Sequence, residues 1–279
     1  MSAVTLLAPA KLNLTLHITA RRPDGYHEID SLVAFADYGD RITLELSDCL
    51  SLEVTGAFAG GLQSEPADNL MMRAAKALQA YAPGKGAHMT LIKNLPVGAG
   101  LGGGSSDAAA AIKGLTHLWN LSLPVDTVHA TALSLGSDVP VCMAAQPARI
   151  QGTGDKVTPV RVQLPRWVVL VNPGKELPTA NVYKGFKGAF ARTENINAVY
   201  GLDYVLQRRN MLEASACEHL PEITNILAVL AATTGCLMAR MSGSGATCFG
   251  MYEGEAAAQG AEGKIRSAYP SYWVRATTL

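Results

Sequence analysis

Five glycines lie within residues 95–106, in the stretch "LPVGAGLGGGSSDAAA", which leads straight into an alanine-rich segment. Glycine tolerates positive φ angles and lets backbone N–H groups approach a ligand closely. A helix that begins at such a loop adds unpaired N–H donors and a partial positive charge. We expect an anion to bind here, because a turn without a ligand would not repay the chain entropy lost by so many glycines.

Two familiar anion-binding loops fit this stretch poorly. A P-loop needs a lysine after the last glycine of G-x-x-x-x-G-K-[ST], and Ser105 stands there. Gly98, Gly100 and Gly103 match the dinucleotide pattern G-x-G-x-x-G, but several predicted strands precede them. The acid about 20 residues later, Asp126, lies at the start of a predicted helix instead of at a strand end. Both loops are therefore disfavoured.

Two charged residues stand where they could face a cleft. Lys11 shares the polar face of an alternating strand with Asn13, and such a face suits a cleft as well as solvent. Asp138 lies in "GSDVP", a break between a predicted helix and a short predicted strand from Val141. An aspartate in such a break more commonly caps a helix. A nearby cation would instead keep it ionised and prepare it as a base.

The elements that must position these residues predict an α+β fold. Alternating or continuous apolar runs predict strands over residues 12–18, 31–37, 42–46, 50–54, 87–93, 167–174, 236–241, 247–254 and 271–276. Helical apolar spacing predicts helices over 68–82 (with Asp68 as N-cap), 106–118, 124–136, 179–185, 202–219, 221–233 and 254–267. A loose boundary at 150–165 separates a strand-rich half from a helix-rich half. We expect two lobes, residues 1–155 and 156–279.

Composition limits the classes of partner and compartment. The 279 residues include 23 basic and 23 acidic ones, so a long nucleic acid or an anionic membrane is not expected as a partner. The five cysteines form no C-x-x-C pair, which indicates reduced thiols in a cytoplasmic protein. The amino terminus alternates like a strand and is no signal peptide, and no apolar stretch is long enough to span a membrane.

The glycine stretch resembles the phosphate loop of the galactokinase, homoserine kinase, mevalonate kinase and phosphomevalonate kinase (GHMP kinase) superfamily. The resemblance continues in order through "PAKLNLTLHITARRPDGYHEIDSL" (residues 9–32), "LGSDVPVC" (135–142), "GTGD" (152–155) and "MSGSGATCFG" (241–250). It implies a two-lobed GHMP kinase fold, with a ribosomal-protein-S5-like N-terminal ATP-binding and catalytic lobe and a ferredoxin-like C-terminal substrate lobe.

The resemblance implies ATP and Mg²⁺ as cofactors. The residues that it assigns to ATP are Asn69, Lys93, Pro96, Val97, Gly98, Ala99, Gly100, Leu101, Gly102, Gly103, Gly104, Ser105 and Ser106. It favours Ser106 as the Mg²⁺ ligand, although both serines could simply cap the helix. Asn69 could likewise be only a helix N-terminal residue. Asp107, in the first helical turn, is expected to cap or to act indirectly on the metal.

The resemblance also implies catalytic and substrate-binding residues. Lys11 and Asp138 form the catalytic pair, and the substrate-binding residues are Asn13, Tyr26, His27, Thr179, Tyr183, Gly243, Ser244 and Gly245. Tyr26 and Tyr183 would sandwich a cytosine, and His27 would bond the base edge. On the residues alone, a tyrosine packed on the sheet and a solvated histidine fit equally well.

The first motif resembles that of the family members that act on a cytidine diphosphate-linked polyol. The resemblance therefore implies ATP-dependent phosphorylation of a hydroxyl of that substrate, in the non-mevalonate pathway to isoprenoid precursors. Two alternatives stay open: a GHMP kinase of the homoserine or mevalonate type, and a non-catalytic nucleotide-binding sensor on the same fold. A monomer or a weak homodimer is expected.

Overall fold

The computed structural model describes residues 3–62, 68–195 and 199–279. The chain forms two compact units. The first contains Met1–Ala10, Tyr38–Val97 and Gly102–Ala145, and the second contains Lys11–Asp37, Gly98–Leu101 and Gln146–Leu279. Strands β1 (Val4–Asn13) and β3 (His27–Ser47) contribute residues to both units. Each compact unit is therefore built from several stretches of the chain, so no single boundary in the sequence separates the two units. The functional lobes 1–155 and 156–279 stay a prediction.

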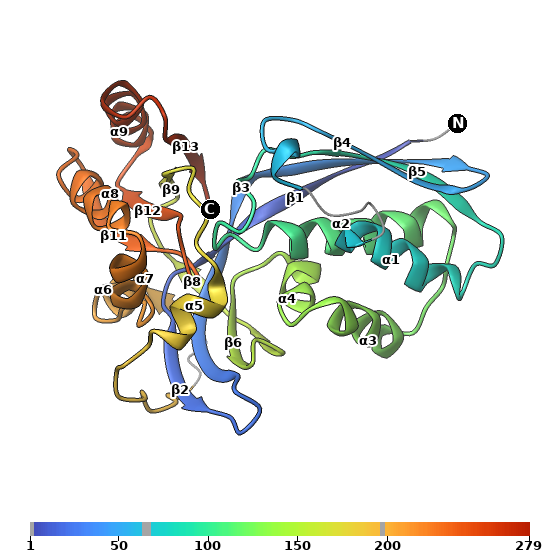
Figure 1. Ribbon diagram of the computed structural model, residues 1–279, viewed down its shortest axis with the longest axis horizontal. Helices are drawn as coiled ribbons and strands as arrows, with labels where there is room; N and C mark the ends of the chain where they lie inside the picture. The colour runs from blue at the N-terminus through green and yellow to red at the C-terminus, as the bar shows by residue number, and fades with distance from the viewer. Residues whose placement is uncertain (1–2, 63–67, 196–198) are drawn as a thin grey trace. The chain divides into compact units, whose positions relative to one another are not determined.

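The first unit packs helices on a small sheet. The second half of β3 pairs antiparallel with β5 (Gly86–Ile92), which pairs parallel with β4 (Leu50–Thr55). The helices α1 (Leu70–Gln79), α2 (Gly103–Leu118), α3 (Val125–Leu135) and α4 (Val139–Ala144) lie on one side of these strands (Figure 1). A short 3₁₀ helix, η1, covers Ala59–Gly61. The alanines of α2, residues 108–111, are all buried and let the neighbouring helices approach closely.

The second unit begins with the sheet around the first half of β3. β2 (His17–Arg21) and β6 (Ala148–Gly152) both pair antiparallel with β3, and β7 (Lys156–Pro159) continues from β6. β8 (Arg161–Gln163) and β10 (Val199–Gly201) form a separate parallel pair. This part of the unit places the polar side chains of β1, β3 and β6 described below.

A four-stranded antiparallel sheet completes the second unit. Its order is β11 (Cys236–Met241), β12 (Cys248–Tyr252), β9 (Trp167–Asn172) and β13 (Trp273–Thr278). The helices α8 (Glu222–Ala231) and α9 (Glu255–Ala268) pack on it. The shorter helices α5 (Thr179–Lys184), α6 (Leu202–Leu206) and α7 (Glu213–His219) belong to the same unit. The expected α+β architecture is confirmed.

Several predicted boundaries are wrong for identifiable reasons. The two strands expected over 31–37 and 42–46 are one strand, β3. A helix, α4, replaces the strand expected from Val141, because Pro140 in the first turn favours a helix start. The helix expected over 202–219 is interrupted between α6 and α7, where Asn210 bonds distant carbonyls. Asn69, instead of Asp68, is the N-cap of α1.

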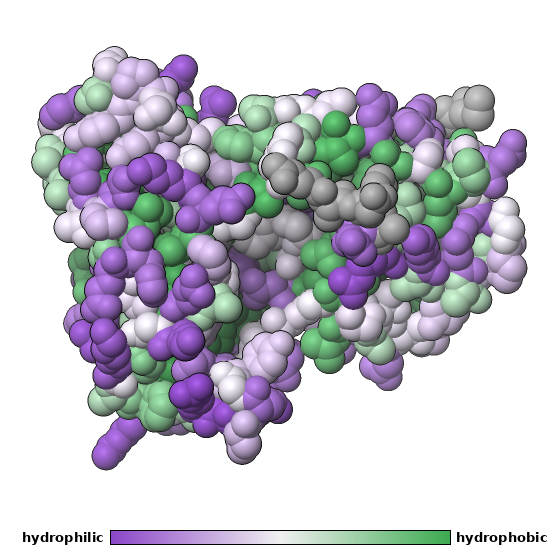
Figure 2. Space-filling view, in the orientation of Figure 1, coloured by the Kyte–Doolittle hydropathy of each residue, from purple (hydrophilic) through white to green (hydrophobic). Residues whose placement is uncertain are grey.

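The surface carries isolated apolar side chains. The larger exposed ones belong to different elements, among them Leu7 on β1, Val125 on α3 and Leu206 on α6. On the face in Figure 2, hydrophobic side chains are interspersed with hydrophilic ones. In the described part of the chain, no helix is both long and apolar enough to cross a bilayer. None of the five cysteines, all of them in described segments, forms a disulfide.

Candidate active site

The glycine loop ends in a helix whose first N–H groups are available to an anion. Gly98, Gly100 and Gly102 have positive φ angles of 63°, 75° and 63°. Gly102 is the left-handed N-cap of α2, which begins three residues before the predicted start at Ser106. The first intrahelical hydrogen bond there runs from Ser106 N to Gly102 O over 2.9 Å. The N–H groups of the residues between them therefore precede the helix ladder, as an anion site requires.

The middle of the loop packs tightly on the third glycine motif within the second unit. A Cβ at Gly100 would lie 2.3 Å from Ser242 O and 2.8 Å from Gly245 O, so only glycine fits. Ser242 Oγ donates to Gly100 O over 2.9 Å, and Thr247 N donates to Ala99 O over 3.1 Å. Residues 98–101 are thus fixed in place by the segment 242–247.

Neither serine at the start of α2 caps the helix. The N-cap position belongs to Gly102, and no side chain makes the capping hydrogen bond. Ser106 lies within the helix, and its hydroxyl donates to Pro9 O over 2.7 Å. The capping alternative is therefore wrong for both serines. The Ser106 oxygen keeps lone pairs that can bind a metal. Its role as Mg²⁺ ligand stays a prediction.

A buried ion cluster ties the two ends of the loop together. Lys93 Nζ lies 2.8 Å from Asp107 Oδ2 on α2 and also bonds the carboxylate of Asp40 on β3. The other oxygen of Asp40 accepts from Asn94 N at 2.6 Å and from Leu95 N at 2.8 Å. One carboxylate therefore fixes the chain that enters the loop, and the lysine links it to the helix that leaves it.

The cluster carries one more carboxylate than it has cations. Asp107 is 3% exposed, and Asp107 Oδ1 is a buried oxygen for which the described residues supply no hydrogen-bond partner. Burial, opposed by Lys93, raises the pKa of Asp107 to about 7. Burial alone would lower the pKa of Lys93, but the charges of Asp107 and Asp40 raise it above its ordinary value. The sequence analysis missed Asp40, since no local pattern marks it.

Asn69 and Lys93, which the family resemblance assigns to the adenine part of ATP, lie near the starts of two helices. Asn69 Oδ1 accepts from Met71 N over 2.9 Å, so Asn69 caps the helix, which does not test its predicted role in ATP binding. A Cβ at Gly104 would lie 3.6 Å from Leu70 Cδ1, and one at Gly103 would lie 3.1 Å from Lys93 Nζ. The first unit thus brings these residues together. The ammonium of Lys93 forms ion pairs with two carboxylates. Contact of these residues with adenine stays a prediction.

The two predicted catalytic residues lie in different units. Lys11 is 4% exposed, and its backbone N–H donates to Leu101 O over 2.8 Å. A lysine that simply faces solvent is therefore excluded. Asp138 is half-buried at the N-cap position of α4, but its side chain makes no capping hydrogen bond. The capping alternative is wrong, and the pairing of Lys11 with Asp138 stays a prediction.

The second unit brings several predicted substrate residues into pairs. The rings of His27 and Tyr183 lie 5.4 Å apart, and the hydroxyls of Thr179 and Ser244 lie 2.8 Å apart. Tyr26 is 68% exposed, so the alternative that it packs on the sheet is wrong. Burial, together with the charge of Arg21, lowers the pKa of His27 below its ordinary value. The imidazole is therefore neutral near pH 7.

Ser242 and Asn210 are structural residues of this region that the sequence analysis missed. Asn13 N donates to Ser242 Oγ over 3.1 Å, while Asn13 Nδ2 donates to Ser31 Oγ over 2.8 Å. Asn210 Nδ2 donates to Met241 O at 2.8 Å and to Gly243 O at 2.7 Å, and so holds the Gly-Ser-Gly loop. Ser242 lies inside a motif that the sequence displays, whereas Asn210 has no local signal.

Comparison with known proteins identifies the family. Residues 69–146 match the model of the GHMP kinases N terminal domain, and residues 186–271 match that of the GHMP kinases C terminal domain. The 4-diphosphocytidyl-2-C-methyl-D-erythritol kinase of Paramagnetospirillum magneticum is 45% identical and covers 100% of this chain and 99% of its own length. That of Cereibacter sphaeroides (strain ATCC 17029 / ATH 2.4.9) is 47% identical and covers 96% of each chain.

Solved structures agree with this assignment. A crystal structure of 4-(cytidine 5'-diphospho)-2C-methyl-D-erythritol kinase superposes with a TM-score of 0.82 at 31% identity, over 99% of this chain and 100% of the other. Homoserine kinase from Cytophaga hutchinsonii shares the fold alone, with a TM-score of 0.69 at 14% identity over 100% of this chain and 95% of the other. The chain therefore belongs to the GHMP kinases and, within them, to the 4-diphosphocytidyl-2-C-methyl-D-erythritol kinases.

Proposed function

We infer that the protein transfers the γ-phosphoryl group of ATP to a hydroxyl of 4-diphosphocytidyl-2-C-methyl-D-erythritol, a step toward isoprenoid precursors by the non-mevalonate pathway. The observation that carries this proposal is the full-length similarity to kinases of that name. The pairing of His27 with Tyr183 supports it, because an aromatic and a neutral imidazole suit a pyrimidine base. The alternatives of another GHMP substrate and of a non-catalytic sensor are correspondingly disfavoured.

The glycine loop would hold the triphosphate. Phosphoryl transfer needs in-line placement and neutralisation of the charge on the transferred group. The N–H groups at the start of α2 and the positive end of its dipole would supply hydrogen bonds and a favourable field for the β- and γ-phosphates. Residues 98–101, fixed by Ser242 and Thr247, would keep the backbone close to them.

Mg²⁺ would accompany the nucleotide. Among the residues that the structure describes, no three carboxylate, histidine or cysteine side chains gather as a metal site. This fits Mg²⁺, which commonly retains waters and takes substrate phosphates as ligands. The hydroxyl oxygen of Ser106 would hold the ion, and Asp107 would act on it indirectly, through its negative charge. The ion would neutralise charge on the phosphoryl group during transfer.

Asp138 would orient or deprotonate the acceptor hydroxyl, and Lys11 would keep its carboxylate ionised. Tyr26 and Tyr183 would stack on the cytosine, where each base contributes about 1–3 kcal/mol by stacking. His27 would then choose cytosine by a hydrogen bond to the base edge. Asn13, Thr179 and the segment 243–245 would contact the rest of the substrate.

We further propose that the protein acts in the cytoplasm as a monomer or a weak homodimer, without a nucleic acid or membrane partner. The equal numbers of basic and acidic residues support the absence of a polyanionic partner. The scattered cysteines, none of which forms a disulfide, are consistent with a reducing compartment.

Product analysis tests the proposed reaction. The purified protein is incubated with ATP, Mg²⁺ and 4-diphosphocytidyl-2-C-methyl-D-erythritol, and the mixture is followed by ³¹P NMR. We expect a new phosphomonoester signal on the cytidyl compound, equal in amount to the ADP formed. ADP released without that signal would mean that the protein hydrolyses ATP and does not phosphorylate this substrate.

A further inference from the structure

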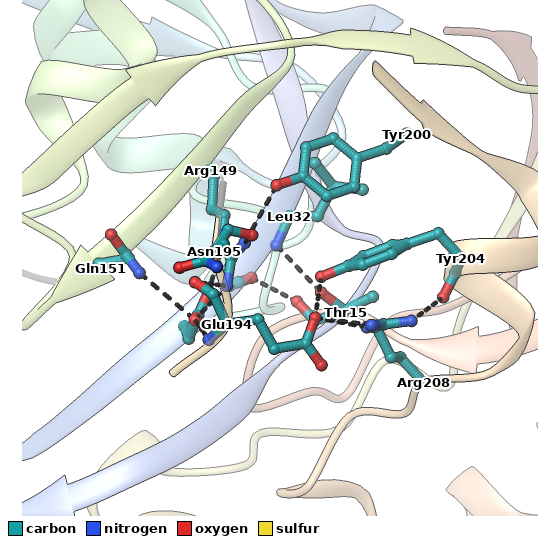
Figure 3. Close-up of polar contacts among 11 residues, drawn as sticks. Thr15, Leu32, Arg149, Gln151, Glu194, Asn195, Tyr200, Tyr204 and Arg208 are labelled. Atoms are coloured by element: carbon teal, nitrogen blue, oxygen red, sulfur yellow. Dashed lines mark hydrogen bonds and ion pairs between the residues drawn. The ribbon is translucent and has the colours of Figure 1, made fainter. Parts of the chain in front are cut away.

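A buried guanidinium holds two segments of the second unit together (Figure 3). Arg149 on β6 is 1% exposed, and all five of its N–H donors have partners. Nε donates to Asp30 Oδ1 over 2.6 Å, and Nη2 bonds the other carboxylate oxygen. The remaining donors reach Glu194 O at 3.0 Å, Asn195 O at 2.7 Å and the Tyr200 hydroxyl at 3.0 Å.

The ion pair of Arg149 and Asp30 bonds both main-chain groups of residue 194. Glu194 N donates to Asp30 Oδ2 over 3.4 Å, while Glu194 O accepts from Arg149. Gln151 Nε2 adds a bond of 3.3 Å to the same carboxylate oxygen. Since these contacts use main-chain atoms of residues 194–195, what they fix is the path of the chain and not one side chain.

The segment fixed in this way carries aromatic rings toward the proposed base subsite. Ala191 N donates to Ile18 O on β2 over 2.8 Å. The ring of Phe190 stacks on Phe186 with centroids 6.2 Å apart, and Phe186 meets His27 edge-on at 6.3 Å. His27 and Asp30 lie three residues apart on β3. The strand that supplies the imidazole thus also supplies the carboxylate that holds the aromatic segment.

The other end of the segment is anchored independently. Ser215 Oγ on α7 donates to Val182 O over 2.8 Å and so fixes α5, which carries Tyr183. Residues 185–195 therefore span two anchors, one at α5 and one at Arg149. Between them residues 187–190 are exposed, Phe190 stacks on Phe186, and Lys187 Nζ lies 3.3 Å from Glu218 Oε2. An exposed ion pair contributes little, so the Arg149 anchor and the Ala191 N–Ile18 O bond limit how far this stretch can move.

We propose that Arg149 and Asp30 are positioning residues for the base subsite. They order the segment 185–195 before substrate arrives, so that Phe186 is held against His27, beside Tyr183, to receive a pyrimidine. This inference rests on the proposed function, which assigns the cytosine to His27 and Tyr183. Ordering a binding segment in advance lowers the entropy that binding must otherwise remove. Loss of the anchor therefore acts on substrate affinity and leaves the phosphoryl-transfer step intact.

Arg149→Lys tests the proposal without removing the buried charge. A lysine can still pair with Asp30, but its single ammonium cannot reproduce the fork that bonds two successive carbonyls. We expect the KM for the cytidyl substrate to rise at least fivefold, with kcat and the KM for ATP within twofold of the unmodified protein. Arg149→Met is expected to raise the same KM further. An inactive misfolded fraction would lower the apparent kcat and leave KM unchanged, which separates positioning from a loss of folded protein.

Tyr204→Phe is the matched control. It removes the hydroxyl that donates to Glu194 Oε2 over 3.1 Å, a bond of the same network to a side chain instead of to the main chain that Arg149 holds. We expect it to leave both KM values within twofold. Should the KM of Arg149→Lys match that of Tyr204→Phe, the ion pair supports the fold alone and the proposal is wrong.

A second readout needs no substrate. Trypsin can cut after the exposed Lys187 and Arg192, and such cleavage follows the opening of the segment. We expect Arg149→Lys to be nicked at these positions at least fivefold faster than the unmodified protein, and Tyr204→Phe at the unmodified rate. Equal nicking of all three would refute the anchor. If the unmodified protein does not phosphorylate the cytidyl substrate, the proposed function is refuted instead. The nicking rates still decide whether the anchor exists.

Discussion

Asp138 lies at the N-cap position of α4, yet its side chain does not cap the helix. The proposed function makes this half-buried carboxylate the group that orients the acceptor hydroxyl.

Asp138→Asn removes the charge and keeps the shape of the side chain. Because general base catalysis contributes about 10²–10⁴-fold, we expect kcat to fall at least a hundredfold. Nucleotide affinity, measured by isothermal titration calorimetry, should stay within threefold. Asp126→Asn, in the first turn of α3, is the matched control and should keep its turnover. Near-normal turnover of Asp138→Asn would exclude this carboxylate as the base.

His27 gives a prediction about pH. Its lowered pKa means that the folded protein holds the proton less tightly than the unfolded chain, so protonation opposes both folding and a neutral base contact. Its contribution to the free energy of unfolding is present above the ordinary pKa of 6.5 and is lost as the pH falls through the folded pKa. We expect the KM for the cytidyl substrate to be constant from pH 7 upward and to rise as the pH falls below 6.5.

His27→Gln separates this titration from others in the site. Glutamine keeps hydrogen-bonding groups but does not titrate, so its KM is expected to be higher than that of the unmodified protein and flat with pH. The same acid-side rise in both proteins would assign the titration to another group.

At the scale of elements, the proposed function assigns the nucleotide to the glycine loop. Gly100 and Gly98 both have positive φ, but their surroundings differ. A Cβ at Gly98 meets nothing within 4 Å, whereas one at Gly100 would collide with two backbone carbonyls.

Comparing Gly100→Ala with Gly98→Ala therefore separates the effect of a collision with neighbouring backbone from the effect of the strain of a positive φ. Both variants carry the strain of a positive φ, typically about 1 kcal/mol. Only Gly100→Ala must also displace the chain, and we expect it to raise the KM for ATP at least tenfold more than Gly98→Ala does. Equal effects would show that the packing of the loop on residues 242–245 does not matter for the nucleotide.

Asp40 fixes the position of the chain where it enters the glycine loop, and so acts at the scale of elements. Asp40→Ala leaves Lys93 with one buried carboxylate and leaves two backbone N–H groups without an acceptor. Because a buried N–H group left without an acceptor costs about 1–3 kcal/mol, we expect the free energy of unfolding to fall by about 2–5 kcal/mol. Urea unfolding measures it. Asp37→Asn, an exposed carboxylate on the same strand, is expected to change stability by about 0.5 kcal/mol or less.

At the scale of the whole molecule, local patterns predicted most of the elements. The alternation of strands such as Leu50–Thr55 and the apolar spacing of α9 depend on neighbours in the sequence, so the pattern suffices. The sequence predicts a strand from Val141 where α4 lies, because six residues with apolar side chains carry no period that separates a helix from a strand. The break between α6 and α7 depends on Asn210, whose partners lie more than 30 residues away.

The residues of the site divide in the same way, into those that a local sequence pattern marks and those that depend on distant partners. The glycine loop and the residues Tyr26, His27 and Tyr183 were identified from the sequence, because each is marked by residue types at fixed spacing or by the family resemblance. Asp40 and Arg149 were not, since a buried ion pair between distant strands has no local signature. The buried partners of Lys93 are likewise invisible in sequence, and they define its surroundings in the structure.

The central claim concerns which hydroxyl compound the molecule accepts. It is tested most directly by kcat/KM for 4-diphosphocytidyl-2-C-methyl-D-erythritol, homoserine and mevalonate under one set of conditions, from ATP consumption. A base subsite that loses its hydrogen bonds and stacking with the wrong substrate discriminates by about 10⁴-fold or more. We predict at least a thousandfold preference for the cytidyl compound. Comparable values for homoserine or mevalonate, or no consumption of ATP with any of the three, would contradict it.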